Sequence, residues 1–231
     1  MTTTSSVPTG EEAGAATATT AAPSFKVYTK TGDNGSSCLF NMERRDKDDA
    51  VFEALGDVDE LNVAVGVART FAEEGEAVVE DNGAKKTSSV SPSSSDPELL
   101  SRLEQIQSRL LDVGSAVATP LDKSSDWKKR RTEFDECHVD ALEAWIDEYD
   151  QHLPPLKSFI LPSGGKTAVH MHAARTVCRR AERRVVPMVR AGDCPPVIGK
   201  YLNRLSDFLY TAARYAAMRE GREEMPYKKP Q

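Results

Sequence analysis

Cysteine is scarce in this 231-residue sequence, positive charge is not in excess, and no long apolar run is present. The four cysteines show neither Cys-x-x-Cys spacing nor a paired His/Cys pattern, which argues against a zinc site and against a disulfide framework. No run of 18 apolar residues occurs, so a membrane-spanning helix is not expected. The formal net charge of -6 argues against general nucleic-acid or membrane-surface binding. The apolar share of 39% and the charged share of 29% indicate an intracellular, soluble globular domain with free thiols.

Both ends of the chain are polar. Residues 1–24 consist mainly of Thr, Ala, Ser, Pro and Gly, and this composition predicts a disordered tail. The tail has no apolar core typical of a secretory signal and no arginine typical of a mitochondrial presequence. A processed or truncated presequence remains an alternative, so the sequence does not decide between the mitochondrial matrix and the cytoplasm. Residues 222–231 form a second polar tail, and the domain itself is expected to span residues 25–221.

Apolar residues recur at intervals of three and four over much of the chain, which is the period of an amphipathic helix. Five such segments predict an all-α five-helix bundle, and they cover residues 52–68, 99–117, 139–149, 163–190 and 196–216. Ser163 is expected near the N-cap of the fourth helix, and Pro187 is expected to kink or end it. Residues 73–97 are polar and Ser/Pro-rich, which predicts a mobile loop inserted between two helices. The charged stretch 122–133 is expected to be a solvated loop.

The segment from Ser163 to Arg190 carries six arginines. One helical stripe, at positions i, i+4, i+7 and i+8, consists of Arg175, Arg179, Glu182 and Arg183. Such a stripe is either a solvated face or a partner for an acidic helix, for example the one with Asp57 and Asp59. Four arginines within the six positions 179–184 repel one another unless an anion lies between them, and arginine suits bidentate contact with phosphate. The density of cations therefore favours a polyanion, and we expect the triphosphate of ATP.

A second candidate for phosphate contact is the loop of residues 29–37, Thr-Lys-Thr-Gly-Asp-Asn-Gly-Ser-Ser. Gly32 and Gly35 allow positive φ and a close approach of the backbone, while the hydroxyls and Lys30 add donors. An ordinary surface turn remains the alternative, because Gly, Asn and Asp are common turn residues. The residues Gly165 to Thr167 do not complete a P-loop, since that pattern needs a glycine at position 160, where isoleucine stands.

Five motifs follow one another in an order that is seen in one family. They are Tyr28-Thr-Lys-Thr-Gly-Asp33, Gly56-Asp-Val-Asp-Glu-Leu61, Phe159-Ile-Leu-Pro-Ser-Gly-Gly165, Arg175 to Arg184, and Asn203-Arg-Leu-Ser-Asp207. With these motifs the sequence resembles the PduO-type ATP:cob(I)alamin adenosyltransferases over roughly residues 25–220. The run from Cys178 to Pro187 is most similar to the animal mitochondrial branch of that family. Five motifs in order are far more specific than any one of them alone.

The resemblance implies an all-α five-helix bundle that assembles as a homotrimer with active sites between subunits. It implies transfer of the 5′-deoxyadenosyl group of ATP to cob(I)alamin, with Mg²⁺ accompanying ATP and with cobalamin as the second substrate. The implied partners are a cobalamin reductase and a B12-dependent mutase, with no nucleic acid and no membrane. A hypothesis of a different class is a non-catalytic helical bundle that senses nucleotide or corrinoid, or that delivers cobalamin.

Individual site residues also follow from the resemblance. The residues expected to bind ATP are Thr29, Lys30, Thr31, Gly32, Ser37, Cys38, Lys47, Arg179, Arg180, Glu182, Arg183 and Asn203. Arg179, Arg183 and Asp207 are expected to be catalytic. Phe159 is expected to help exclude the lower axial base of the corrinoid, and Asp59 and Arg175 are expected to form an ion pair across the subunit interface. No metal-coordinating side chain is assigned. Because Co(I) is itself a strong nucleophile, the protein's main electrostatic task is to stabilise the departing triphosphate.

Overall fold

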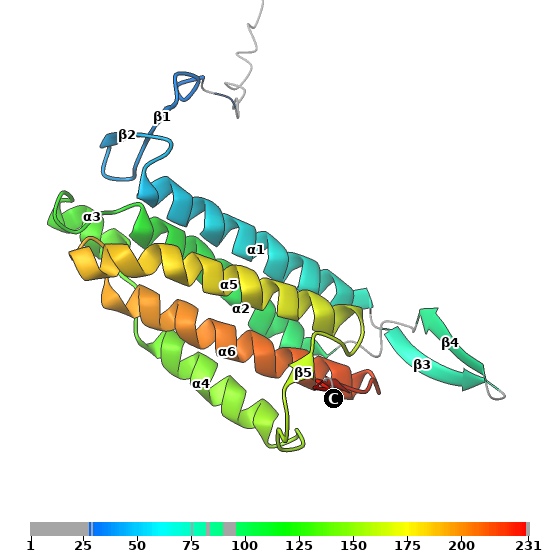
Figure 1. The fold of residues 1–231 in the computed structure, drawn as a ribbon. Helices are drawn as coiled ribbons and strands as arrows, with labels where there is room; N and C mark the ends of the chain where they lie inside the picture. Colours follow the sequence, from blue (N-terminus) through cyan, green and yellow to red (C-terminus); the bar gives the residue numbers. More distant parts are fainter. Residues whose placement is uncertain (1–27, 29, 75, 82–83, 90–95, 230–231) are drawn as a thin grey trace, which may run out of the picture.

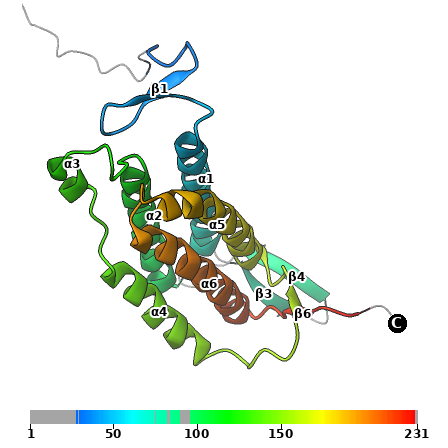
Figure 2. The ribbon, with the colours of Figure 1, turned by 60° about the vertical axis from the view of Figure 1, so that its left-hand side comes forward.

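The computed structural model describes residues 28, 30–74, 76–81, 84–89 and 96–229. Within these ranges five long helices lie side by side as a bundle, which confirms the all-α prediction (Figure 1, Figure 2). The helices are α1 (Ala50–Glu74), α2 (Pro97–Val117), α4 (Cys137–Asp150), α5 (Lys166–Ala191) and α6 (Pro196–Arg219). None of the helices in the described ranges is long and apolar enough to cross a membrane.

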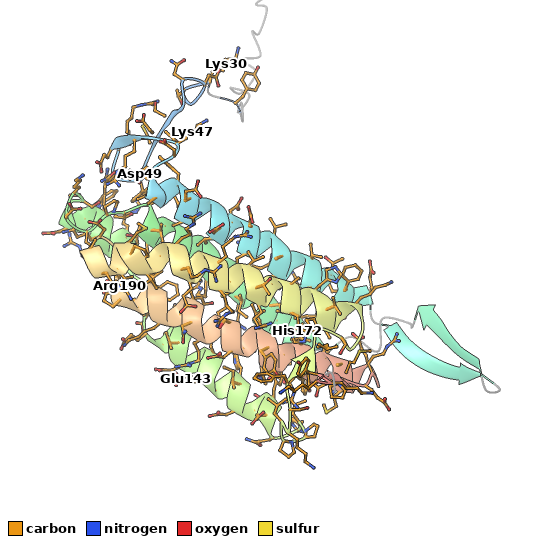
Figure 3. All side chains as sticks on the ribbon, viewed as in Figure 1. Lys30, Lys47, Asp49, Glu143, His172 and Arg190 are labelled. Atoms are coloured by element: carbon orange, nitrogen blue, oxygen red, sulfur yellow. The ribbon has the colours of Figure 1, made fainter. Side chains whose placement is uncertain are left out.

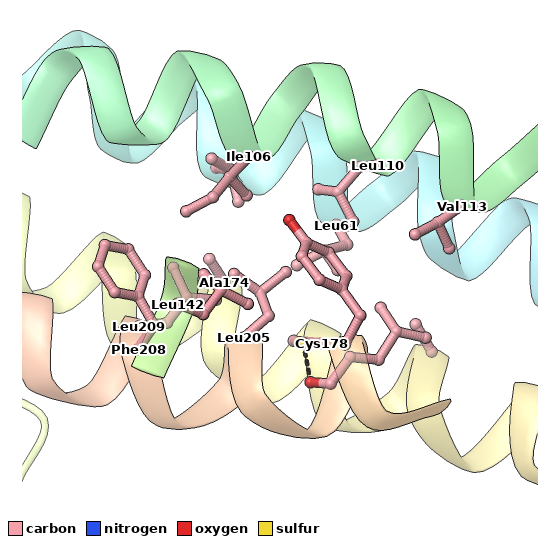
Figure 4. Packing of buried hydrophobic residues seen from close by; sticks show 14 of the residues in the cluster. Leu61, Ile106, Leu110, Val113, Leu142, Ala174, Cys178, Leu205, Phe208 and Leu209 are labelled. Atoms are coloured by element: carbon pink, nitrogen blue, oxygen red, sulfur yellow. Dashed lines mark hydrogen bonds between the residues drawn. The ribbon is translucent and has the colours of Figure 1, made fainter. Parts of the chain in front are cut away.

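The hydrophobic core runs along α5 and α6, which pack against each other, while α5 also packs against α1. The buried stripe of α5 contains small side chains, among them Ala174, Cys178 and Ala181, which are fully buried. Small side chains allow a close approach of helix axes. Figure 4 shows Ala174 and Cys178 beside Leu205 of α6, and the Cys178 thiol donates a hydrogen bond to the Leu202 carbonyl at 3.1 Å. This packing commits one face of α5 to the core and leaves the faces with the arginines outside it.

The two ends of α5 differ from the expectation. Pro187 does not end the helix, which continues to Ala191 and stops at Gly192 in the left-handed region, with φ 81°. The buried side chains of Val185 and Met188 hold the helix against the core on both sides of the proline, and this packing outweighs the lost backbone hydrogen bond. Ser163 lies near the N-cap, as expected, but does not occupy it. Gly165 takes that position, with φ 98° and ψ 176°, a backbone region that is essentially restricted to glycine.

Two stretches that the sequence suggested to be loops contain regular structure. Residues 73–97 were expected to form a mobile loop. The described part of this range holds the last residues of α1 and two antiparallel strands, β3 (Glu76–Asp81) and β4 (Ala84–Ser89), while residues 75, 82–83 and 90–95 lie outside the described residues. The expected solvated loop 122–133 contains the short helix α3 (Asp126–Arg131), in which the Arg131 guanidinium lies 4.8 Å from the Trp127 ring. Basic residues in its last turn also complement the helix dipole.

Two further pairs of short strands lie at the ends of the bundle (Figure 1). β1 (Ser36–Cys38) and β2 (Arg44–Asp46) pair antiparallel just before α1. β5 (Ile160–Leu161) pairs antiparallel with β6 (Met225–Pro226) just before α5. β6 belongs to the segment that was expected to be a polar C-terminal tail, so this segment is instead joined to the chain in front of α5.

Candidate functional site

Arg180, which was predicted to bind ATP, and the neighbouring Arg184, which was not, are both engaged by acids of α1. Arg180 donates from Nε to Oδ1 of Asp57 at 2.9 Å, and a second nitrogen of its guanidinium contacts Glu60. Arg184 pairs with Glu53 at 3.2 Å and reaches the other carboxylate oxygen of Asp57 at 3.7 Å. The Asp57 side chain is only 13% exposed, so its charge depends on these two guanidinium groups. Arg180 and Arg184 therefore form salt bridges to the acidic helix α1, which was the alternative to anion binding.

Arg179 and Arg183 have a different environment. Both are exposed, and neither forms an ion pair with any residue in the part of the chain that the structure describes. The acid between them, Glu182, accepts a hydrogen bond from the side chain of Asn203 on α6 at 2.9 Å. The structure thus brings Glu182 and Asn203 together, beside two cations that are available to an anionic ligand.

A cavity of about 600 Å³ lies next to this pair, between α4, α5 and α6. Glu182 and Asn203 line it together with the charged residues Glu136, Asp140, Glu143, Lys200 and Arg204. Arg204 donates to Glu143 of α4 at 2.8 Å and to Asp207 at 3.2 Å, so the predicted catalytic Asp207 is held by a neighbouring cation. The sequence analysis did not select Arg204, although its spacing of three residues from Asp207 is the spacing of a helical ion pair.

The loop before β1 forms a second group of polar side chains, and Thr29 of this group lies outside the described residues. Arg44 holds the loop together, because its guanidinium donates to the Thr31 carbonyl at 2.8 Å and to the Ser36 hydroxyl at 2.7 Å. Lys30 adopts φ 58°, in the left-handed region. A Cβ added to Gly32 would lie 3.2 Å from Nζ of Lys47, so the glycine makes room for that amine. Sequence reasoning found the loop and Lys47 but missed Arg44, whose role depends on the β1–β2 pairing.

Ser37 and Cys38 lie on β1, opposite Arg45 and Arg44 of β2. The Cys38 thiol is exposed, and its Sγ lies 3.7 Å from the Arg44 guanidinium. The hairpin projects beyond the start of α1, with Lys30 and Lys47 away from the bundle (Figure 3). Between described residues of this single chain, no hydrogen bond or ion pair joins the hairpin to Arg179 or Arg183. The two predicted phosphate-binding elements are therefore separate within one chain.

Phe159 stands at the opposite end of the bundle, immediately before β5, and is 84% exposed. Its carbonyl accepts a hydrogen bond from the Tyr227 amide at 2.8 Å, which extends the β5–β6 pairing by one residue. Because side chains alternate between the two faces of a strand, Phe159, Leu161, Met225 and Tyr227 share one face of this ribbon. All four are exposed, and an exposed apolar patch of this kind is typical of a ligand or partner site.

Arg175 and Asp59, the predicted interface pair, do not meet within the chain. Asp59 is exposed on α1, while Arg175 lies 5.8 Å from the Tyr210 ring and its buried Nε has no hydrogen-bond partner among the described residues. His172, one turn before Arg175, is buried. Burial and the nearby Arg175 charge lower the pKa of His172. The His172 ring and the Arg175 guanidinium thus lie close together on α5, with little access to solvent at His172.

A model of the cobalamin adenosyltransferase family matches residues 27–216. The corrinoid adenosyltransferase MMAB of Mus musculus is 49% identical over 211 residues, which cover 91% of this chain and 80% of the mouse protein. The corrinoid adenosyltransferase of Bacillus subtilis is 38% identical over 206 residues, covering 89% of this chain and 93% of that protein.

Solved structures give the same result. A variant of the PduO-type ATP:corrinoid adenosyltransferase from Lactobacillus reuteri, complexed with cobalamin and ATP, superposes with a TM-score of 0.72 at 33% identity. That match covers 88% of this chain and 100% of the bacterial one. A second variant of the same enzyme, complexed with ATP, gives a TM-score of 0.71 at 34% identity, over 87% of this chain and 100% of that one. The resemblance that five sequence motifs indicated is confirmed, and the chain belongs to the cobalamin adenosyltransferase family.

Proposed function

We propose that this protein transfers the 5′-deoxyadenosyl group of ATP to cob(I)alamin, giving adenosylcobalamin and triphosphate. The observation that carries the proposal is the pair Arg179 and Arg183, which is exposed and has no acidic partner among the described residues, beside the Glu182–Asn203 hydrogen bond. In this reaction the electron pair of Co(I) forms the bond to C5′, and the bond from C5′ to oxygen breaks. Its electron pair leaves on the triphosphate, so negative charge accumulates where cations are needed.

The roles of the residues follow from where charge develops. Arg179 and Arg183 neutralise the departing triphosphate, while Glu182 and Asn203 orient the nucleotide. Asp207 accepts a hydrogen bond from Arg204 and is the third residue that we place in a catalytic role, with Arg179 and Arg183. The loop containing Lys30, Thr31 and Gly32, with Ser37, Cys38 and Lys47 beside it, supplies backbone and side-chain donors to ATP. Arg180 serves mainly to tie α5 to α1, since its guanidinium is already occupied by carboxylates.

Mg²⁺ would reach the site bound to the phosphates of ATP and would supply further charge neutralisation there. Within the described ranges, no group of three or more His, Cys, Asp or Glu is placed to hold a metal ion. The arginines are then the protein's own contribution to stabilising the leaving group. Orientation of C5′ towards cobalt is the second contribution, since a near-attack geometry removes much of the entropic barrier.

A second copy of the chain completes the site in this proposal. The loop near Lys47 and the stripe with Arg179 are separate within one chain, and the buried Nε of Arg175 lacks a partner there. Asp59 of a neighbouring subunit would pair with the accessible part of the Arg175 side chain in a homotrimer with sites between subunits. Light scattering should then give three times the 25.3 kDa chain mass. The variant Asp59→Asn should weaken assembly or turnover, and a fully active trimer of this variant would contradict the ion pair.

Phe159 is placed at the corrinoid in this proposal, on the apolar face of the β5–β6 ribbon. An apolar wedge there disfavours the lower axial base, and a base-off cobalamin is easier to reduce to Co(I). Reduction itself requires a separate cobalamin reductase, and the product suits a B12-dependent mutase. The compartment that fits these partners is the mitochondrial matrix in a eukaryote and the cytoplasm otherwise.

The direct test is an anaerobic mixture of the protein, ATP, Mg²⁺ and chemically reduced cobalamin, followed by absorbance. Formation of adenosylcobalamin at a rate proportional to protein concentration is the expected result. A non-catalytic sensor or delivery protein would bind both ligands without that change in absorbance. Absence of turnover while Co(I) persists would overturn the enzymatic function.

A further inference from the structure

One buried cation joins the two segments of chain on either side of the ribbon that carries Phe159. Arg214 of α6 is buried, and its Nε donates to Oε1 of Glu224 at 2.8 Å. A second nitrogen of the same guanidinium donates to the Pro154 carbonyl at 2.7 Å. Glu224 directly precedes β6, and Pro154 lies in the chain that leads to β5. The guanidinium therefore holds both approaches to the ribbon.

The backbone around Phe159 depends on β6 for its position. The Tyr227 amide donates to the Phe159 carbonyl at 2.8 Å, and the Met225 amide donates to the Ser163 hydroxyl at 2.9 Å. Phe159 itself is 84% exposed, so its side chain has little packing of its own to fix it. Order at Phe159 must consequently come through these backbone hydrogen bonds and through whatever holds β6 in place.

A buried guanidinium is costly unless it is paired, so the contacts of Arg214 are strongly favoured once α6 has formed. Its carboxylate partner is Glu224, which lies ten residues further along the chain, beyond the end of α6. By contrast, Glu223 is exposed and forms no ion pair with the described part of the chain. Two adjacent glutamates thus differ in whether they hold β6 against the bundle.

We infer that Arg214 and Glu224 are positioning residues for the corrinoid site, acting by fixing the β5–β6 ribbon and with it Phe159. The inference rests on the proposed function, in which Phe159 meets the corrinoid. It extends that function to an ion pair at the end of α6, between the buried Arg214 and the partly buried Glu224. Neither residue touches the reacting atoms; each acts through the backbone of β6.

The test compares Glu224→Ala with Glu223→Ala in the full-length protein. Hydrogen–deuterium exchange of the C-terminal peptide with Met225 and Tyr227 reports the ribbon directly. Titration with cob(II)alamin in the presence of ATP, and with ATP alone, reports the two ligand sites. Glu224→Ala should lose the exchange protection and weaken cobalamin binding by about tenfold or more, since a 1 Å misplacement at a site can cost about a hundredfold in rate. ATP affinity should stay within about twofold, and Glu223→Ala should match the unmodified protein.

Glu224→Gln is a conservative control in case Glu224→Ala does not fold, because the glutamine amide oxygen can still accept a hydrogen bond from Nε of Arg214. This variant should keep most of the protection and bind cobalamin more tightly than Glu224→Ala does. Unchanged protection in Glu224→Ala would overturn the anchor, and lost protection with unchanged cobalamin affinity would overturn its link to the corrinoid site. Failure of the unmodified protein to form adenosylcobalamin would instead overturn the proposed function, so the two failures are distinct.

Discussion

Separate replacement of Arg179 and Arg180 by alanine tests how the arginines of α5 divide their work. The two residues are adjacent in sequence and identical in chemistry, but only Arg180 is paired with acids of α1. We expect Arg179→Ala to reduce turnover with the fold intact. We expect Arg180→Ala to reduce stability with most of the turnover intact.

The magnitudes follow from what each guanidinium contacts. Arg179 is exposed and forms no ion pair with another described residue, so its loss should change the free energy of unfolding by no more than about 0.5 kcal/mol. A charge-assisted hydrogen bond to phosphate contributes about 1.5–3 kcal/mol, so kcat/KM for ATP should fall by about 10- to 150-fold. Arg180 is 42% exposed, and loss of its two ion pairs should cost about 1–2 kcal/mol, because Arg184 still reaches Asp57. In a chain of this length, that loss corresponds to a fall of roughly 2–8 °C in Tm.

Thermal melts and the anaerobic adenosylation assay measure the two quantities on the same preparations. Arg190→Ala is the matched control, since Arg190 is an exposed arginine of the same helix beyond the stripe, and its turnover should equal that of the unmodified protein. If Arg180→Ala lost as much kcat/KM as Arg179→Ala at an unchanged Tm, Arg180 would be a phosphate ligand and the tether to α1 would be refuted. Full activity in Arg179→Ala would refute the phosphate role of the stripe.

Three further predictions concern the turn, the aromatic and the histidine. Gly164→Ala should lower the free energy of unfolding in urea by about 2–5 kcal/mol, since φ is 98° and the new Cβ would lie 2.5 Å from Cβ of Ala217. Gly192→Ala is the control: with φ 81° and open space around the new Cβ, it should lower that free energy by only about 1–2 kcal/mol. Equal losses in the two variants would contradict the clash with Ala217. Phe159→Ala should raise KM for cobalamin but not for ATP and leave Tm unchanged, because the side chain is 84% exposed; a parallel rise in both KM values would remove it from the corrinoid site. His172 has a lowered pKa in the folded state, so the stability it contributes is complete above the unfolded value of about 6.5 and is lost as the pH falls towards the folded pKa. Urea midpoints at pH 7.5 and 5.5 should therefore differ less in His172→Gln than in the unmodified protein, and an equal difference would exclude His172 as the source.

Local periodicity was enough to predict the bundle. The apolar residues of α6 recur at intervals of three and four, and Leu202, Leu205 and Leu209 are all fully buried as expected. The same period placed Arg179 and Arg183 on one face of α5. Five motifs in order also indicated the family, because such a combination is specific even without coordinates. These features depend on the backbone geometry of a helix and on the identity of the residues, both of which are present in the sequence.

The sequence could not decide which partner each face of α5 would meet. Arg180 and Arg184 lie about 100° around the helix from Arg179 and Arg183, since each residue turns the helix by that angle. Only the packing of α1 against α5 brings Asp57 to the first pair and leaves the second pair exposed. Pro187 was expected to kink or end α5, and it does not end the helix for a related reason, because burial of the flanking side chains outweighed a local preference.

The C-terminal segment gives the clearest division between the two kinds of information. By itself the sequence established the helices, the family motifs and the supply of arginines, because these follow from spacing along the chain. The tertiary structure alone decided that Glu224 pairs with Arg214 and that β6 lies beside β5, some 60 residues away in sequence. A polar, Glu-rich C-terminus is typical of a solvated tail. It is ordered here because Arg214 is buried in the bundle, and a buried guanidinium needs a carboxylate partner such as Glu224.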